Sequence, residues 1–306
     1  MDTPIVRVDR FQSNELYIKR EDLIPFSFGG NKARKAELFF REIDRGNFDC
    51  VVTYGSSSSN HCRVISNMAA SRSMECYIIS PEEASEPTFN SNMMERFGAR
   101  ITVCKEEEVH GTIESLIERL EKEGKKPYFI AGGGHGNIGT HSYYQCYEEI
   151  RSYEKQTGIH FDYIFHASGT GTTQAGLVCG KLINSDDKSI VGISIARKNP
   201  RGRNVVVQSV KEYLSEKGFR TDLEAVEDAV IFDDSYTGDG YGANTSAEII
   251  EYIMNKYGIP LDSVYTGKAF GGMLDYIKKN DIGDKNILFI HTGGTPLFFD
   301  FLEKHK

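Results

Sequence analysis

The sequence contains no tryptophan, only eight prolines and no long apolar run among its 306 residues. The apolar runs at 163–165 and 287–290 have the length of strands and fall far short of the roughly 20 residues that cross a bilayer. The start of the chain mixes apolar with charged side chains, so it lacks the basic and then apolar order of a secretion signal. We therefore expect no membrane partner and a cytoplasmic location.

Basic residues are in deficit, since 36 lysines and arginines stand against 44 aspartates and glutamates, a net charge of −8. Such a chain repels the phosphate backbone of nucleic acids, so we expect no nucleic-acid partner. The six cysteines include no CxxC pair, and their scattered positions favour buried thiols over disulfides or metal ligands. We therefore expect no metal. The cysteines are Cys50, Cys62, Cys76, Cys104, Cys146 and Cys179.

Short apolar runs alternate with amphipathic stretches along almost the whole sequence. This alternation is typical of βαβ units, and the length suits two lobes. We predict the α/β class, with mostly parallel sheets flanked by helices. The amphipathic stretches carry apolar residues at helical spacing, as at Ala36, Phe39, Phe40 and Ile43. The predicted strands are 15–18, 50–53, 76–79, 101–104, 128–130, 163–165, 190–195 and 287–290.

Five polar segments that contain glycine flank the predicted elements. In open α/β sheets such segments gather at the carboxyl ends of the strands, where ligands bind. One shared pocket would account for all of them. The segments are 29–35, 55–63, 132–139, 168–176 and 291–296.

Residues 168–173 read Ser-Gly-Thr-Gly-Thr-Thr between a predicted strand and a helix that is expected to start near Gln174. Backbone amides and hydroxyls at a helix N-terminus suit a phosphate group, so we predict a phosphate site. A dinucleotide site of the NADP type is the alternative. It is weakened because Gln174 occupies the third glycine position of GxGxxG and Arg197 stands where an acidic ribose ligand is expected.

Lys32 follows Gly29 and Gly30 at the start of another predicted helix. A lysine in the first turn faces an unfavourable helix dipole, which lowers the pKa of its amine and helps to supply the neutral form that Schiff-base chemistry needs. A solvated surface lysine beside Arg34 and Lys35 is the alternative. The position of Lys32 does not decide between these hypotheses.

The segments 17–23 (YIKREDL) and 29–35 (GGNKARK) resemble the lysine region of the D-cysteine desulfhydrase and 1-aminocyclopropane-1-carboxylate (ACC) deaminase family. Four further regions match this family in order, so the resemblance spans almost the whole chain. They are Gly55 with Ser59-Asn60-His61, Gly133-Gly134 with Gly139 and Tyr143, the segment 168–176, and the segments 264–269 and 291–294.

The resemblance implies two open, twisted, mostly parallel sheet lobes of the tryptophan synthase β-like fold, with pyridoxal 5'-phosphate as cofactor. A larger cofactor-binding domain would comprise residues 1–35 and 145–306, and a smaller α/β domain would comprise 36–144. Members of this family are usually homodimers, so a homodimer is expected by analogy.

The resemblance also implies roles for single residues. Lys32 would bind the cofactor covalently, and its released amine would take the proton from the substrate Cα. Asn60 would bond the 3-oxygen of the cofactor, and Ser59 at the start of the helix 60–70 would receive the substrate carboxylate. The expected cofactor-binding residues are Lys32, Asn60, Gly169, Thr170, Gly171, Thr172, Thr173, Thr266 and Thr292. The expected substrate-binding residues are Ser59, Asn60 and His61, and the expected catalytic residues are Lys32, Ser59, Tyr241 and Tyr265.

Two positions distinguish the branches of this family. The deaminase branch carries glutamate after the tyrosine of segment 264–269 and leucine in the last glycine segment, where this sequence has Thr266 and Thr292. A carboxylate keeps the pyridine nitrogen protonated and the cofactor a strong electron sink, whereas a neutral hydroxyl leaves a weaker one. A weaker sink suffices when a β-leaving group departs, so we predict α,β-elimination from a small amino acid. D-cysteine is the expected substrate, giving pyruvate, ammonia and hydrogen sulfide.

Several alternatives remain at this point. His135 and Gly136 replace the usual Ser-Asn of the family beside the expected substrate pocket, so cysteate, serine, chloroalanine or ACC could be the substrate. Arg197, Arg201 and Arg203 could admit an anionic side chain at the rim of that pocket or could simply be solvated. Outside the family, an NADP-dependent oxidoreductase and a non-catalytic cofactor-binding protein are the other hypotheses.

Overall fold

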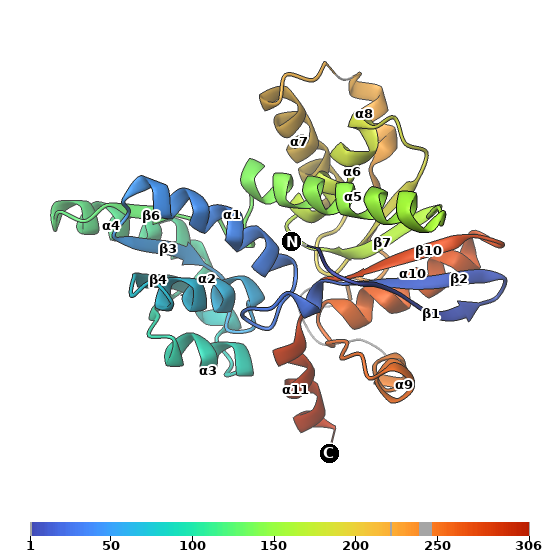
Figure 1. The fold of residues 1–306 in the computed structure, drawn as a ribbon. Helices are drawn as coiled ribbons and strands as arrows, with labels where there is room; N and C mark the ends of the chain where they lie inside the picture. The colour runs from blue at the N-terminus through green and yellow to red at the C-terminus, as the bar shows by residue number, and fades with distance from the viewer. Residues whose placement is uncertain (1, 221, 239–246, 306) are drawn as a thin grey trace.

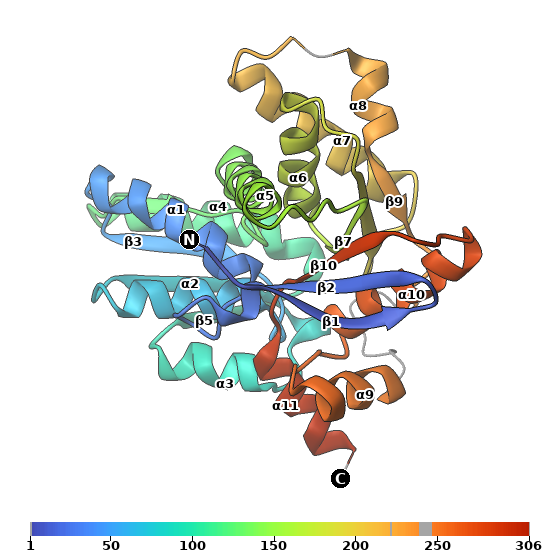
Figure 2. The ribbon, with the colours of Figure 1, turned by 45° about the vertical axis from the view of Figure 1, so that its right-hand side comes forward.

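The computed structural model describes residues 2–220, 222–238 and 247–305, which form two sheets covered by helices (Figure 1). Six strands form the larger sheet: β1 (Ile5–Phe11), β2 (Asn14–Arg20), β7 (Tyr163–Ser168), β8 (Ser189–Ser194), β9 (Ile231–Asp233) and β10 (Asn286–His291). Their order is β1-β2-β10-β7-β8-β9, and β1 pairs with β2 in antiparallel fashion whereas the other neighbours are parallel. In Figure 2 the β1–β2 hairpin lies beside β10.

The smaller sheet has the order β5-β4-β3-β6 and is parallel throughout its described pairs. Its strands are β3 (Cys50–Tyr54), β4 (Glu75–Pro81), β5 (Arg100–Cys104) and β6 (Pro127–Phe129). The described helices are α1 (Asn31–Gly46), α2 (Asn60–Ala70), α3 (Phe89–Arg96), α4 (Val109–Lys122), α5 (Asn137–Thr157), α6 (Thr172–Ile183), α7 (Arg201–Glu216), α8 (Leu223–Ala229), α9 (Ala247–Tyr257), α10 (Thr266–Lys279) and α11 (Thr295–Lys304), with short 3-10 turns η1 (Glu21–Leu23), η2 (Glu82–Ala84) and η3 (Glu106–Glu108).

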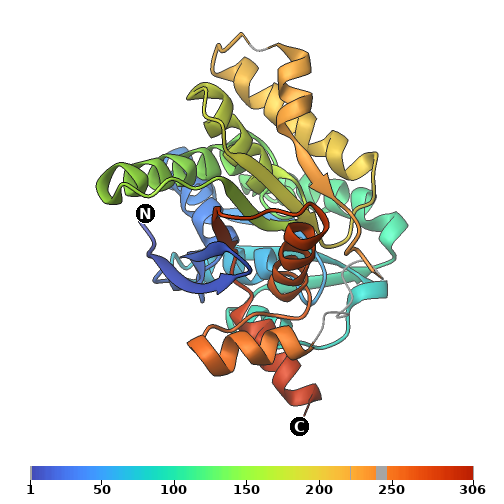
Figure 3. The ribbon, with the colours of Figure 1, turned by 90° about the vertical axis from the view of Figure 1, so that its right-hand side faces the viewer.

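Alternate residues of each buried strand supply two cores, one on either face of the sheet. On β10, Leu288 and Ile290 pack under the helices α5 to α8, whereas Ile287 and Phe289 pack against α9, α10 and α11. Figure 1 shows these two helical layers above and below the larger sheet. Both faces are covered, which explains why the strand sequences are almost continuously apolar. In Figure 3 the C-terminus lies at the free end of α11, well away from the N-terminus.

The structure confirms the α/β class and all eight predicted strands, seven of them to within two residues at either end, whereas β7 continues three residues beyond its predicted end. It adds β1 and β9, which sequence periodicity did not indicate. Strand β1 alternates its apolar residues with Arg7, Asp9 and Arg10 and is only partly buried at the sheet edge, and β9 has only three residues. The cysteine prediction holds, since all six thiols are free and only Cys104 is partly exposed.

Every strand between residues 50 and 129 belongs to the smaller sheet, and the strands before and after this range form the larger one. This membership supports the division into domains of 36–144 and of 1–35 with 145–306, which stays a proposal. No helix of the described residues is long and apolar enough to cross a membrane.

Candidate active site

The loop that leads into α1 has an unusual backbone. Ser27, Phe28, Gly29 and Gly30 all have positive φ, and Gly30 reaches 94°. A Cβ atom on Gly30 would lie 2.7 Å from the carbonyl oxygen of Thr292, so only glycine fits there. The backbone N–H of the next residue, Asn31, donates to that same oxygen at 3.0 Å. The loop therefore packs the first turn of α1 against the residues that follow β10.

Lys32 lies in this first turn, partly buried, and its Nζ donates to the carbonyl oxygen of Gly133 at 3.0 Å. Burial and the nearby charge of Arg197 lower the pKa of Lys32 to about 8. The amine therefore has a substantial neutral fraction near pH 8, which a solvated lysine lacks. These features agree with the hypothesis of a reactive lysine and not with that of a surface lysine.

The segment 168–173 lies where the sequence predicted it, between β7 and α6. Helix α6 begins at Thr172, two residues before the predicted start, and Gly171 precedes it with φ of 98°. Thr172 and Thr173 are buried, and the Thr173 hydroxyl accepts a hydrogen bond from Asn31 Nδ2 at 3.1 Å. A Cβ atom on Gly133 would lie 2.6 Å from Thr170 Cγ2, so the 132–139 segment closes on this loop.

Lys35 is a site residue that the sequence prediction missed. Its side chain is buried, and its Nζ donates to Thr172 Oγ1 at 2.7 Å. Burial and the charge of Lys32 lower the pKa of Lys35 well below its ordinary value. Among the described residues no carboxylate pairs with Lys35, and an anion bound at the start of α6 would favour its protonated form. Adjacent lysines and arginines in sequence suggest exposure, and only the helical position of Lys35, one turn after Lys32, hinted otherwise.

The start of α2 carries the three expected substrate-binding residues. Ser59 is the N-cap and accepts a hydrogen bond from the Cys62 N–H at 3.1 Å. The Asn60 side chain accepts through Oδ1 from Asn90 Nδ2 at 3.0 Å, so its amide Nδ2 is left as the donor. Together these residues present a hydroxyl and an amide at a helix N-terminus, which suits an anion.

His61 is buried against β3. The Thr53 hydroxyl donates to the Ile130 carbonyl oxygen at 2.7 Å, so it accepts from His61 Nε2, which lies 2.9 Å away. Burial together with Lys32 and Lys35 lowers the pKa of His61 well below its ordinary value. His61 is therefore a neutral imidazole with its proton on Nε2 and an acceptor lone pair on Nδ1.

At the start of α10, Asp262 holds Thr266. The buried Asp262 carboxylate accepts from the Thr266 hydroxyl at 2.7 Å and from the backbone N–H groups of Val264, Tyr265 and Thr266. Tyr265 rather than Thr266 is the N-cap, and Thr266 Oγ1 is fixed with its proton toward Asp262. A Cβ atom on Gly294 would lie 2.2 Å from Asp262 Oδ2, so this helix start adjoins the segment of Thr292.

The arginines of the predicted rim differ in their surroundings. Arg197 donates through Nη1 to the carbonyl oxygen of Thr170 at 3.3 Å and faces the candidate site. Arg203 lies on the exposed surface, where it bonds the Glu227 carbonyl oxygen. Arg201 lines an open cavity of about 500 Å³ with His135 and the face of α7. Tyr241 lies outside the described residues.

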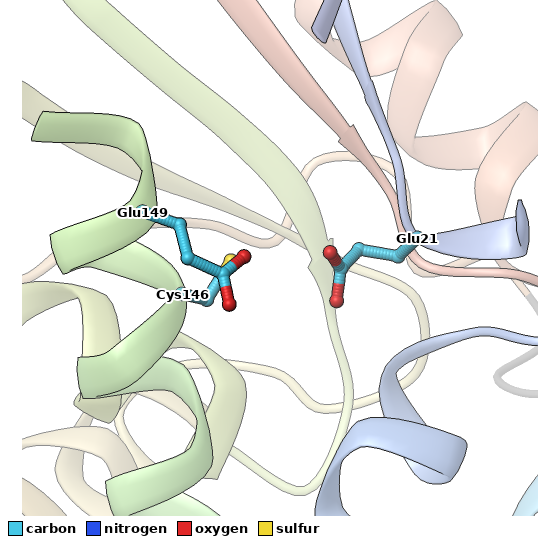
Figure 4. Close-up of side chains that lie close together, drawn as sticks. All are labelled: Glu21, Cys146 and Glu149. Carbon is cyan, nitrogen blue, oxygen red and sulfur yellow. The ribbon is translucent and has the colours of Figure 1, made fainter. Parts of the chain in front are cut away.

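A cluster of charged side chains ties α1 to α5. Figure 4 shows the Glu21 and Glu149 side chains facing each other, with Cys146 beside Glu149 on α5. Arg34 bonds both carboxylates, its Nη1 lying 2.8 Å from Glu149 Oε1, and Lys19 Nζ lies 3.0 Å from Glu149 Oε2. Because these cations already balance the two carboxylates, the cluster is an ion-pair network that anchors the helix of Lys32.

The fold and site define a two-sheet α/β protein with a buried amine facing a phosphate-type helix N-terminus. Residues 1–293 match the family model described as pyridoxal-phosphate dependent enzyme, and the chain belongs to this family. A D-cysteine desulfhydrase of Serratia proteamaculans (strain 568) is 31% identical, with 98% of this chain and 93% of the relative covered. One of Yersinia pestis (strain Pestoides F) is 32% identical with the same coverage. A solved structure described as an ACC deaminase homologue is 33% identical, has a TM-score of 0.87, and matches over 99% of this chain and 93% of its own.

The residues of the site fit pyridoxal phosphate. Lys32 offers the amine, Gly169 to Thr173 offer hydroxyls and the amides of a helix start, and Lys35 and Arg197 offer positive charge beside Thr170 and Thr172. The comparisons confirm the predicted cofactor and the prediction of an enzyme, and they favour this family over the nicotinamide alternative.

Proposed function

We propose that the chain catalyses α,β-elimination from a small β-substituted amino acid, with D-cysteine as the substrate. The observation that carries the proposal is the amine of Lys32, which donates to the carbonyl oxygen of Gly133, a residue that in turn packs against Thr170 of the phosphate-type loop. The full-length similarity to enzymes named D-cysteine desulfhydrase supports the substrate. The products would be pyruvate, ammonia and hydrogen sulfide.

The chemistry of each site residue suggests its role in the proposed reaction. When bound, pyridoxal phosphate supplies the electron sink for the charge that develops at the substrate Cα. Lys32 Nζ would accept the Cα proton, because its lowered pKa provides the neutral amine. Gly169, Thr170, Gly171, Thr172 and Thr173 would hold the phosphate, aided by the charge of Lys35. Asn60 would donate to the 3-oxygen of the cofactor through Nδ2.

Ser59, Asn60 and His61 would orient the substrate at the start of α2. The helix dipole favours the substrate carboxylate there, and the neutral His61 adds no charge. Tyr265 and Tyr241 are proposed proton carriers.

The hydroxyls of Thr266 and Thr292 support elimination over ring opening. Where the deaminase branch carries a glutamate, Thr266 is neutral, and a neutral partner suits a substrate whose leaving group removes the developing charge. Cysteate, serine, chloroalanine and ACC are the alternative substrates to test. A homodimer and a cytoplasmic location are further parts of this proposal, by analogy with the family.

The test of this function compares Lys32→Ala with Lys279→Ala. Lys32→Ala removes the reactive amine, whereas Lys279 is exposed at the end of α10 and serves as the matched control. We expect the control to release sulfide and pyruvate from D-cysteine at the rate of the unchanged protein. Lys32→Ala should lose turnover by at least about 10³-fold and show no covalent cofactor band. If Lys32→Ala kept both its turnover and the covalent cofactor band, the proposal would be contradicted.

A further inference from the structure

Arg63 is a fully buried arginine with no carboxylate beside it. Arg63 is the fourth residue of α2 and has 0% relative exposure, and among the described residues no acidic group pairs with it. Its Nε finds no hydrogen-bond partner among these residues. Burying an uncompensated charge is costly, so this arrangement requires a reason other than the stability of the fold.

Among the described residues, the hydrogen-bond partners of Arg63 are Asn60 of the candidate site and Ser27 of the loop before Lys32. Its Nη1 donates to the carbonyl oxygen of Ser27 and, at 3.1 Å, to the Ser27 hydroxyl. Its Cζ lies 5.7 Å from the centre of the Phe28 ring. Ser27 and Phe28 both have positive φ, so Arg63 fastens a loop whose backbone is strained.

The other hydrogen bond of Arg63 fixes the amide of Asn60. Arg63 Nη2 donates to Asn60 Oδ1 at 3.3 Å, and Asn90 Nδ2 donates to the same oxygen at 3.0 Å. Asn90 is itself buried and uses its second N–H on the Ser58 carbonyl oxygen at 2.9 Å. Because two donors hold Oδ1, the Asn60 amide cannot turn over without losing both, and Nδ2 must be the group that it offers to a ligand.

We propose that Arg63 is a positioning residue that orients the Asn60 amide toward the oxygen of the bound cofactor and extends positive potential to that oxygen. A charged donor on Oδ1 polarises the amide and strengthens the hydrogen bond that Nδ2 donates. The bound cofactor would then supply the negative charge that Arg63 lacks among the described residues. This inference rests on the proposed role of Asn60.

The cationic surroundings of the site are consistent with this role. Arg197 also lies at the site without a carboxylate partner among the described residues, and Lys35 offers a further N–H donor there, so the site favours an anionic ligand. A phosphate and an ionised ring oxygen carry the complementary charge. Arg63 is the member of this group that bonds Asn60.

The test is a double-mutant cycle on the absorption spectrum of the cofactor-loaded protein. The readout is the ratio of the visible band to the near-ultraviolet band, since a positive environment at the ring oxygen favours the form that absorbs in the visible. We expect Arg63→Met and Asn60→Ala each to lower this ratio at least about twofold and to weaken cofactor binding about tenfold. The double variant should add little to either single change, because both act through one hydrogen bond.

Three further variants keep the test decisive. Arg72 is an exposed arginine just after the end of α2 and bonds Asp44. Arg72→Met should therefore leave the absorbance ratio unchanged. Arg63→Lys keeps the charge and should lower the ratio less than Arg63→Met. If Arg63→Met does not fold, Asn90→Leu removes the other donor to Asn60 Oδ1 and should lower the ratio in its place.

The outcomes separate this inference from the proposed function. The inference would be overturned if the effects of Arg63→Met and Asn60→Ala on the absorbance ratio were additive. It would also be overturned if Arg63→Met lost thermal stability with an unchanged ratio, because Arg63 would then be only structural. Failure of the unchanged protein to bind the cofactor would instead overturn the proposed function.

Discussion

At the scale of single residues, the amine of Lys32 sets a pH dependence that can be measured without turnover. Its pKa is lowered to about 8 because burial and Arg197 disfavour the charged form. Only the neutral amine attacks an aldehyde, so the rate of covalent cofactor capture by the cofactor-free protein should rise about tenfold per pH unit below pH 8 and level off above it. Stopped-flow absorbance measures this rate. A midpoint near that of an ordinary lysine, about 10.4, would contradict the assignment.

The sequence could indicate Lys32 as the candidate reactive lysine, whereas the burial of the charged residues around the site could not be predicted from it. Gly29, Gly30 and the helix that follows them marked Lys32 as unusual. Lysine and arginine are among the side chains least often buried, and only the position of Lys35 one helical turn after Lys32 hinted at the burial of either Lys35 or Arg63. Their environment depends on segments distant in the chain, at Thr172 and at Ser27, which only the folded structure brings together.

At the scale of elements, the junction between β7 and α6 depends on Gly171. Its φ of 98° is one that L residues rarely adopt, and a Cβ atom there would lie 3.2 Å from Val205 Cγ1. We expect Gly171→Ala to lower the free energy of unfolding by about 1–3 kcal/mol and to weaken binding of pyridoxal phosphate at least tenfold, because the first amides of α6 turn away from the phosphate. Urea unfolding and absorbance titration measure the two effects.

Gly218→Ala is the matched control for this prediction. Gly218 also has positive φ, 76°, but has open space around its Cβ position at the end of α7. The Gly218→Ala variant should lose about 1–2 kcal/mol of the free energy of unfolding and keep its affinity for the cofactor. Equal loss of affinity in both variants would mean that backbone strain, and not the position of Gly171, is responsible.

Element boundaries were predictable where local chemistry decides them. Helix α2 begins at Asn60 and ends at Ala70, as Ser59 and the pattern after it indicated. Helix α10 begins at Thr266, but its first N–H groups donate to the carboxylate of Asp262, four residues upstream. This cap spans a turn that the hydroxyl pattern does not reveal. Strand β1 was missed because its charged residues interrupt the continuous apolar run by which the buried strands were found.

At the scale of the whole molecule, the two sheets meet through the buried charges around Glu21. Burial opposes ionisation of Glu21, yet the charge and hydrogen bonds of Arg34 lower the pKa of its carboxyl. Glu21→Gln would leave Arg34 with one carboxylate between α1 and α5. We expect it to lower the free energy of unfolding by about 3 kcal/mol in urea denaturation.

The exposed pair of Glu37 and Arg41 on α1 provides the comparison. Arg41 is 58% exposed, so Glu37→Gln should cost less than about 0.5 kcal/mol. A similar small loss for Glu21→Gln would mean that the buried network does not hold the two sheets together. The second junction, where the Phe89 N–H of α3 donates to Asp300 of α11 at 3.1 Å, would then be the dominant one.

The mostly parallel sheets followed from the alternation of elements, but the contacts between the two sheets did not. The predicted gathering of the glycine segments at one place is seen in the bonds of Asn31 to Thr173 and to Thr292. In the larger sheet β2 lies beside β10, although the two strands come from opposite ends of the sequence. No local pattern specifies that pairing. The family resemblance therefore supplied what periodicity could not.

The central claim is that this chain removes a β-substituent from D-cysteine with the amine of Lys32 and pyridoxal phosphate. The most direct measurement is the visible absorption spectrum of the cofactor-loaded protein during addition of D-cysteine, with sulfide and pyruvate assayed in the same sample. We predict a visible band that shifts on addition and equal amounts of the two products. A band that stays unchanged with no sulfide formed would contradict D-cysteine as the substrate, and failure of any band to form with added cofactor would contradict the whole account.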